Sequence, residues 1–522
     1  MKRLIIAAFA TLLACACAAA DAAPLRVEGG LIQGSQAGGI GVFEGVPFAA
    51  PPVGALRWRA PQPVRPWQGV KAATRFAPAC MQISRANALL GIPAVPVSED
   101  CLYLNIWSPA KSPGERLPVM VWIYGGGFTQ GATSFPAYSG EQLARKGVVL
   151  VSISYRLGPF GFLATPELAA ESHGGGAGNY GLLDQIAALK WIQRNISAFG
   201  GDPRKVTIFG ESAGGIAVSV LSASPLARGL FAGAISESGG SFAPDRQDDN
   251  SGEQVLPLAA DEQKGAAFLA KLGAHDLAGA RALTSDAINQ AAGPALAGFW
   301  PTDDGVAVLG DQVKLYRAGR FNDTPVLIGT NADEGALFVG QTTAAQYVAS
   351  VRAGYGAYAD KILAAYPAGS DAEALRSARD LMRDSTFAWA TWTWARLQSQ
   401  KGHGKAFVYY FNHRPPYPDS PATRDWGASH GSEIAYVFGH LDPKATASDA
   451  ATAEALMTYW TNFAKTGDPN GGAQPAWPPF TDMSRGSMRF EAEGPVAAPL
   501  PNLDKLHVLD GYFAWRRGET AP

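Results

Sequence analysis

A serine framed by two glycines stands at an abrupt change of pattern near the middle of the chain. Residues 206–209 (Val-Thr-Ile-Phe) are typical of a β-strand, and the small residues after position 215 are typical of a helix. Between them lies Gly210-Glu211-Ser212-Ala213-Gly214. A strand that turns directly into a helix strains the serine backbone and leaves room beside it only for glycine. The pattern therefore predicts a nucleophile at Ser212 rather than an ordinary Gly/Ser-rich turn.

A serine nucleophile needs a histidine base and a carboxylate that orients this base. In folds with this strand–turn–helix arrangement, the carboxylate follows the serine along the chain and the histidine comes last. Residues 324–330 are typical of a short apolar strand, which leads into Asn331-Ala332-Asp333-Glu334-Gly335. Asp333 and Glu334 are therefore both candidates for the acid, and the local pattern does not choose between them.

The base has to be one of seven histidines, and the chain order removes His173. His430 lies among small residues (Gly427-Ala428-Ser429-His430-Gly431), which leave room for a substrate and for an imidazole that transfers a proton. His440 is a weaker alternative because it follows the next apolar run. We therefore predict that His430 is the base.

Acyl transfer also needs backbone N–H groups that stabilise an oxyanion. Residues 118–124 are typical of a strand, and they lead into Gly125-Gly126-Gly127-Phe128. Successive glycines weaken regular structure but allow backbone N–H groups to approach a ligand. The predicted donors are the N–H groups of Gly126, Gly127 and Ala213.

Strand-like and helix-like segments alternate along most of the chain. The strand-like runs are residues 118–125, 148–155, 206–211, 231–238, 324–330 and 406–412. This alternation predicts an α/β fold with a mostly parallel central sheet that helices cover on both faces. Residues 261–274 and 371–397 read as helices within long insertions on either side of the predicted acid.

Four aromatic residues in the second insertion are too densely spaced for one helical face. They are Phe387, Trp389, Trp392 and Trp394. The simplest interpretation is that they belong to the core. The alternative is that some of them project into the active site or an interface, and the sequence leaves both open.

Several further motifs occur in a fixed order. They are FEGVPFAAPPVG (43–54), SEDCLYLNIW (98–107), YRLGPFGFL (155–163), NYGLLDQ (179–185) and FGGDP (199–203). With the glycine loop, the serine turn and NADEG (331–335), they resemble the type-B carboxylesterase/lipase family, which includes para-nitrobenzyl esterase-like and cholinesterase-related enzymes. The resemblance covers nearly the whole chain after residue 22. It implies an α/β-hydrolase fold, with large helical insertions over an active-site gorge.

The resemblance also assigns residues. It implies that Glu334 is the acid and that His430 is the base. Three positions match a hydrogen-bonded cluster beside the histidine of similar proteins: Glu211, Ser238 and Glu433. Three aromatic residues are candidates to line the gorge: Phe128, Trp300 and Phe338. Two pairs match buried ion pairs of the family: Arg57 with Glu99, and Arg156 with Asp184.

The N-terminus has the pattern of a secretory leader. A basic start (Lys2, Arg3) precedes a short apolar run and small residues up to Ala22. We expect residues 1–22 to be a signal peptide and residues 23–522 to form one catalytic domain, exported to the periplasm or secreted. The run is too short and too alanine-rich at its end for a stable membrane span. An alternative is a lipoprotein signal, with a lipid anchor at Cys15.

Removal of the leader would leave two cysteines, Cys80 and Cys101. A single pair in an exported chain predicts a disulfide, and the family pattern also pairs these positions. The loop between them contains no aromatic residue. Cholinesterases carry a tryptophan in this loop that binds quaternary ammonium, so choline esters are not expected as preferred substrates.

Charge and motif content exclude several functional classes. The formal net charge is −2 and no cluster of basic residues stands out, which argues against nucleic-acid binding. No zinc-site spacing, P-loop or dinucleotide motif occurs, and the hydrolysis needs no cofactor.

The sequence therefore predicts an exported serine hydrolase that cleaves small-molecule carboxylic esters through an acyl-enzyme. The alternatives are a lipase that acts at an interface, or a surface binding module with an idle triad. The natural substrate and the oligomeric state stay open.

Overall fold

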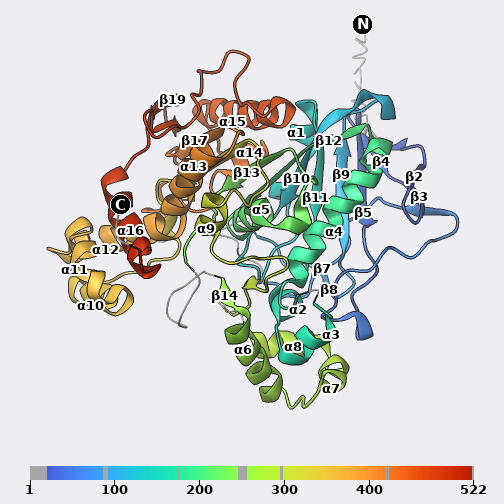
Figure 1. Cartoon of the computed structure of the whole chain (residues 1–522). Coiled ribbons are helices and arrows are strands. Elements are labelled where there is room, and N and C mark those ends of the chain that lie inside the picture. The colour runs from blue at the N-terminus through green and yellow to red at the C-terminus, as the bar shows by residue number, and fades with distance from the viewer. Residues whose placement is uncertain are drawn as a thin grey trace, which may run out of the picture.

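The computed structural model describes residues 20–519, apart from residues 86, 88–91, 175, 245–254, 294–297, 419 and 421–422. At its centre lies a twelve-stranded sheet with the strand order β1-β4-β5-β9-β11-β10-β12-β13-β16-β17-β18-β19 (Figure 1). The adjacent strands from β11 to β18 run parallel. These strands are β11 (Val149–Ile153), β10 (Leu117–Ile123), β12 (Gly201–Glu211), β13 (Gly233–Glu237), β16 (Val326–Asn331), β17 (Ala406–Phe411) and β18 (Gly486–Glu491).

Antiparallel strands extend the sheet at both ends. They are β1 (Ala20–Asp21), β4 (Ser35–Ala37), β5 (Ile40–Pro47), β9 (Tyr103–Ser108) and β19 (Gly494–Pro499). Smaller sheets pair β2 (Leu25–Val27), β3 (Gly30–Gln33) and β6 (Val70–Ala72), β7 (Ala79–Cys80) with β8 (Val97–Ser98), and β14 (Leu256–Pro257) with β15 (Thr302–Asp303).

The central strands are largely buried because helices pack against the sheet. In β10, every residue from Pro118 to Ile123 is buried, which is typical of a parallel strand without a solvent-facing side. Helix α5 (Ala213–Ala223) packs against β12 and β13, and α15 (Ala447–Thr466) packs against β10 and β12. The predicted α/β fold with a mostly parallel, helix-covered sheet is confirmed.

The remaining helices surround this core. They are α1 (Glu141–Arg145), α2 (Gly158–Phe162), α3 (Pro166–Glu171), α4 (Tyr180–Asn195), α9 (Gln312–Arg317), α14 (Ile434–Val437) and α16 (Leu503–Arg516). One insertion holds α6 (Leu258–Lys271), α7 (Leu277–Ala282) and α8 (Ser285–Ala292), which lie together at the bottom of Figure 1. The other begins with α10 (Ala344–Tyr355), α11 (Ala359–Ala365) and α12 (Asp371–Arg383), at the left of the same view.

Both predicted insertion helices are present, but the second is not regular. Helix α12 passes into a π-helical segment, Asp384–Ala388, before α13 (Trp389–Lys401) continues. A π-helical turn holds one residue more than an α-helical turn, and it persists where tertiary contacts fix it. Sequence periodicity does not reveal such contacts.

The predicted leader lies mostly outside the described residues. Ala20 and Asp21 form β1, which pairs with β4, and Ala22 is buried. Cys15 is also outside the described part. Within the described residues, no helix has both the length and the apolar character that a membrane crossing requires.

Strand order places three strand ends together. The parallel strands β12, β13 and β16 are neighbours, with Glu211 opposite Glu237 and Glu237 opposite Gly329. Residues that follow these strands therefore meet at one edge of the sheet, which is where open α/β sheets usually bind their ligands.

Candidate active site

Ser212 occupies a strained turn between β12 and α5. Its φ of 54° and ψ of −123° lie in a region that non-glycine residues rarely adopt. The flanking glycines make this turn possible, because a Cβ on Gly210 or Gly214 would lie 2.5 Å or 1.9 Å from the carbonyl oxygen of Ile123. The N–H of Ser212 donates to the carbonyl of Glu237 at 2.9 Å, so the strained turn is tied to the neighbouring strand.

Glu334 and His430 are hydrogen-bonded to each other. Glu334 is fully buried in a short 3₁₀ turn after β16, and its Oε2 lies 2.6 Å from Nδ1 of His430. Its other oxygen, Oε1, accepts hydrogen bonds from the hydroxyl of Ser238 (2.5 Å) and the N–H of Asn331 (2.7 Å). Three donors therefore surround a carboxylate that no water reaches.

Asp333, the other acid candidate, makes different contacts. Its carboxylate accepts the N–H of Ala428 at 2.9 Å, and its own N–H donates to the carbonyl of Ala428 at 3.0 Å. Asp333 thus connects the acid turn to the loop that carries His430. The geometry brings Glu334, and not Asp333, to the imidazole.

The second imidazole nitrogen of His430 faces a carboxylate. Nε2 lies 3.2 Å from Oε1 of Glu211, the residue before Ser212. The hydroxyl of Ser212 is partly exposed, and among the described residues it makes no hydrogen bond to His430. Burial lowers the pKa of His430, but the negative charges of Glu211 and Glu334 raise it by more.

Two further buried glutamates lie close to Glu211. Glu237 accepts the indole N–H of Trp460 at 2.7 Å, and Glu433 accepts the side-chain amide of Asn331 at 2.5 Å. One oxygen of each carboxyl has no hydrogen-bond partner among the described residues. Burial raises the pKa of Glu211, Glu237 and Glu433. The cluster can therefore hold protons near neutral pH, which limits the negative charge around the imidazole.

The predicted cluster residues Glu211, Ser238 and Glu433 all lie beside the acid–histidine pair, as their contacts show. Glu237 was missed by the sequence analysis. A signal was present, because Glu237 ends the strand-like run 231–238 directly before Ser238. The ends of adjacent parallel strands meet at one edge of the sheet, so an acidic residue at the end of this run is expected to lie near the site.

Two phenyl rings contact the imidazole of His430. Phe387 stacks on it, with ring centroids 4.7 Å apart and planes 21° from parallel. Phe338 meets it edge-on at 5.0 Å. Phe387 is 1% exposed and Phe338 is 40% exposed, so the second ring is the one that solvent reaches.

The glycine loop lies beside Ser212. A Cβ on Gly125 would lie 2.8 Å from Oε2 of Glu211 and 3.0 Å from Cβ of Ser212. Gly126 and Gly127 have φ values of 97° and 62°, which suit glycine. Within the described part of the chain, no group accepts a hydrogen bond from the N–H of Gly126, Gly127 or Ala213. These three donors are free to bind a ligand atom.

The other aromatic candidates lie in different surroundings. Phe128 is fully buried and packs edge-on against Phe162 and Trp300, both at 5.1 Å. Trp300 is 8% exposed. In the dense aromatic cluster, only Phe387 contacts His430, whereas three residues pack elsewhere in the core. These are Trp389 against Phe513, Trp392 against His507, and Trp394 against Phe242.

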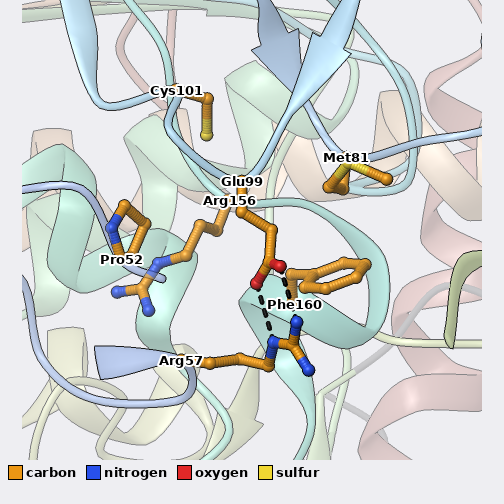
Figure 2. A pocket seen from close by; sticks show the side chains of 7 residues that line it. All are labelled: Pro52, Arg57, Met81, Glu99, Cys101, Arg156 and Phe160. Atoms are coloured by element: carbon orange, nitrogen blue, oxygen red, sulfur yellow. Dashed lines mark hydrogen bonds and ion pairs between the residues drawn. The ribbon is translucent and has the colours of Figure 1, made fainter. Parts of the chain in front are cut away.

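The expected ion pairs and disulfide are present. Arg57 binds both oxygens of Glu99, at 2.7 and 2.6 Å, and Arg156 binds both oxygens of Asp184 at 2.8 Å. Cys80 and Cys101 form a disulfide. Figure 2 shows the small pocket between these features, where the carboxylate of Glu99 meets Arg57 beside Phe160 and Met81. None of Ser212, Glu334 and His430 lines this pocket.

No candidate metal centre accompanies the site. Over the residues that the structure describes, no group of three or more histidine, cysteine, aspartate or glutamate side chains is arranged to hold a metal ion.

A parallel sheet with a strained serine between β12 and α5, and a histidine bound to a buried carboxylate, defines an α/β-hydrolase fold with the parts of a serine hydrolase. The model of the family described as "Carboxylesterase family" matches residues 21–502. The chain belongs to the carboxylesterase family. It is accordingly an enzyme that hydrolyses carboxylic esters.

Similar proteins are known from bacteria and animals. Fumonisin B1 esterase of Sphingopyxis macrogoltabida is 39% identical over 505 residues, which cover 91% of this chain and 88% of that protein. Para-nitrobenzyl esterase of Bacillus subtilis (strain 168) is 35% identical, covering 89% and 94%. Carboxylesterase 4A of Bos taurus is 35% identical, covering 84% and 86%. The solved structure of a PNB esterase aligns with a TM-score of 0.80 at 33% identity, over 93% of this chain and 99% of that one.

Proposed function

We propose that Ser212, Glu334 and His430 are the catalytic triad of this carboxylesterase. The N–H groups of the oxyanion hole are those of Gly126, Gly127 and Ala213. The observation that carries this proposal is the 2.6 Å hydrogen bond between Glu334 and Nδ1 of His430, on a loop beside the strained Ser212. This bond fixes the tautomer that leaves Nε2 available to a serine hydroxyl.

The reaction proceeds in two halves. Nε2 of His430 takes the hydroxyl proton of Ser212 while Oγ attacks the ester carbonyl carbon. The carbon–oxygen bond to the alcohol then breaks, and the alcohol leaves with the proton from His430. Water next attacks the acyl-enzyme, with His430 again as base, which releases the carboxylic acid and restores the serine. Glu334 stabilises the imidazolium that forms in each half.

The contact between Nε2 and Glu211 is compatible with this role. Catalytic hydrogen bonds are often long or misaligned in an enzyme without substrate, and they tighten in the substrate complex. In the substrate complex, Nε2 would exchange its contact with Glu211 for one with the hydroxyl of Ser212. Glu211, Ser238 and Glu433 then hold the imidazole and its surroundings in place.

The substrate is a small-molecule ester. The names of two relatives supply the first compounds to test, fumonisin B1 and para-nitrobenzyl esters. We further propose that residues 1–22 direct export to the periplasm or the medium and that residues 23–522 are the enzyme. The alternative in which Cys15 is lipidated would retain it at a membrane surface.

The test is hydrolysis of para-nitrophenyl esters from acetate to palmitate by the purified protein beside Ser212→Ala. We expect activity on short chains, and loss of about 10⁴-fold or more in the variant. Unchanged turnover in Ser212→Ala would overturn the assignment of the nucleophile.

The same series separates the two alternatives. A sharp rate increase above the solubility limit of a long-chain ester would identify a lipase that acts at an interface. Failure of a folded protein to react with an organophosphonate at Ser212, together with no turnover of any ester, would identify a binding module with an idle triad.

A further inference from the structure

The π-helical segment Asp384–Ala388 lies directly against the candidate active site. It is the one π-helix among the described residues, and it separates α12 from α13. Such segments are less stable than regular α-helix and frequently occur at functional sites. The extra residue rotates helix α12 by about 100° about the helix axis relative to α13, because each residue of an α-helix turns by that angle.

The segment delivers one phenyl ring to His430. Phe387 is 1% exposed, and its ring stacks on the imidazole at 4.7 Å and 21°. The hydrogen bond from Nδ1 to Glu334 fixes one edge of the imidazole, and the stack fixes the orientation of its plane. The face of an aromatic ring also stabilises a cation above it. Phe387 therefore favours the imidazolium over the neutral ring.

A buried ion pair holds the start of the segment. Arg383 and Asp384 are 5% and 0% exposed and share two hydrogen bonds, at 2.7 and 3.1 Å. The hydroxyl of Tyr366 donates to Asp384 at 3.0 Å. With both oxygens of Asp384 occupied, the pair is fully desolvated and well satisfied, and such pairs mainly fix conformation.

The same arginine reaches the acid turn. Nη1 of Arg383 donates to the carbonyl of Ala332 at 2.9 Å, two residues before Glu334. Helix α12 also touches this turn directly, because a Cβ on Gly335 would lie 2.3 Å from the carbonyl oxygen of Arg379. Helix α12 thus contacts the turn that carries Glu334, and the π-helical segment that follows it contacts the imidazole of His430.

We propose that the Arg383–Asp384 pair and Phe387 are positioning residues for ester hydrolysis: the pair fixes the π-helical segment, and the segment sets Phe387 against His430. This inference rests on the proposed role of His430 as the base. The titratable groups that face His430 are Glu211, Glu334 and Glu433. The side chain of Phe387 carries no charge, so its replacement by leucine leaves the number of charges around His430 unchanged.

The principal test compares Phe387→Leu with Phe407→Leu. Phe407 is fully buried in β17 and packs against Phe463 and Trp477, away from His430. Both variants lose a buried ring, so both are expected to melt at a lower temperature. Only Phe387→Leu is expected to lose kcat, by about tenfold with KM little changed, since a cation–π contact of 1–2 kcal/mol corresponds to this factor. Equal kcat in the two variants would overturn the proposal.

A second readout does not depend on turnover. In protein with ¹³C-labelled histidine, the signal that is lost in His430→Asn identifies the imidazole, and its pH titration is followed in wild type and Phe387→Leu. We expect the midpoint to fall by about one unit when the ring that favours the cation is removed. An unchanged midpoint would contradict the proposed contact. A different result would count against the proposed function: a folded wild-type protein that hydrolyses no ester, or a Ser212→Ala variant that remains active.

The ion pair is tested through its coupling to Phe387. Asp384 does not touch His430, yet Asp384→Asn is expected to lower kcat as Phe387→Leu does. If the pair acts through the ring, the double variant is expected to lose little more kcat than the more impaired single variant. Additive losses would show that the ion pair and the ring act independently, which would overturn the proposed link between them.

Discussion

Ser238 donates its hydroxyl proton to Oε1 of Glu334, the carboxylate oxygen that His430 does not use. The two hydrogen bonds use different oxygens and do not compete, so Ser238 can orient the carboxylate of Glu334 without weakening its contact with His430. Both residues follow adjacent parallel strands, β13 and β16, so the sheet itself sets their spacing.

Removal of the Ser238 hydroxyl is expected to lower activity without removing it. A hydrogen bond to a charged group contributes about 1.5–3 kcal/mol, so Ser238→Ala should lose roughly 10- to 100-fold in kcat if the whole effect is felt in the transition state. Ser487→Ala is the matched control, since Ser487 is a buried serine of β18 that donates to the carbonyl of Ala498. An equal kcat for both variants would contradict the orienting role of Ser238.

The two neighbouring acids of the acid turn are expected to respond differently to neutralisation. Glu334→Gln removes the charge beside His430, and loss of the orienting carboxylate typically costs about 10⁴-fold in kcat. Asp333→Asn should retain most of the activity, because Asp333 binds the N–H of Ala428 and not the imidazole. Steady-state kinetics of the two variants decide this, and a greater loss in Asp333→Asn would reverse the assignment.

A methyl group on Gly125 is expected to disable the site while the fold remains. Its Cβ would lie within 3.0 Å of both Glu211 and Ser212, and relief of such overpacking usually costs about 1–3 kcal/mol. We expect Gly125→Ala to lose at least about 100-fold in kcat, by displacement of the nucleophile. Gly354→Ala serves as control, because an added Cβ meets no atom within 4 Å on helix α10. Normal turnover in Gly125→Ala would contradict the tight fit.

Acid is expected to remove the contribution of Glu171 to stability. Hydrogen bonds from Arg281 and Arg59 lower the pKa of Glu171 from 4.5 to about 2. A lowered pKa in the folded state means that the stabilisation is present above pH 4.5 and is lost as the pH falls to 2. Urea unfolding should show wild type more stable than Glu171→Gln by about 1 kcal/mol at pH 6, with little difference near pH 2.5. A difference that does not depend on pH would contradict the ion pairs.

The opposite dependence is expected for Glu237. Burial raises its pKa from 4.5 to about 8, so the folded state retains a proton that the unfolded state releases between these values. Stability therefore falls as the pH rises from 4.5 to 8. Glu237→Gln keeps an acceptor for Trp460 and removes this loss, so its advantage over wild type should be on the order of 2 kcal/mol larger at pH 9 than at pH 5. An advantage that is equal at both pH values would contradict the raised pKa.

The architecture could be predicted from the sequence because each central strand has a recognisable local residue pattern. The runs that form β10, β12 and β16 lead into glycine or acidic residues within three positions of each strand end, at the edge of the sheet where the site lies. The serine turn was equally visible, since its backbone strain requires glycine at positions 210 and 214. A local steric requirement restricts which residue types can occupy a position, so it can be recognised in the sequence.

Contacts between segments that are distant in sequence could not be predicted in this way. Asp333 and Glu334 both follow the same strand, and only the path of the loop around Ala428 decides which one meets His430. The π-helical segment was predicted as regular helix, because Ala332 and His430, which contact Arg383 and Phe387, are distant from it in sequence. The stack of Phe387 on His430 likewise depends on two segments that neither pattern alone predicts.

The order of Ser212, Glu334 and His430 along the chain has a consequence for synthesis on the ribosome. A chain emerges from its N-terminus, so the segment with Ser212 appears first, Glu334 follows, and His430 comes last. A nascent chain that ends before His430 carries the proposed nucleophile without the proposed base. Hydrolysis therefore requires that the last third of the chain has been made and has packed against the segments that carry Ser212 and Glu334.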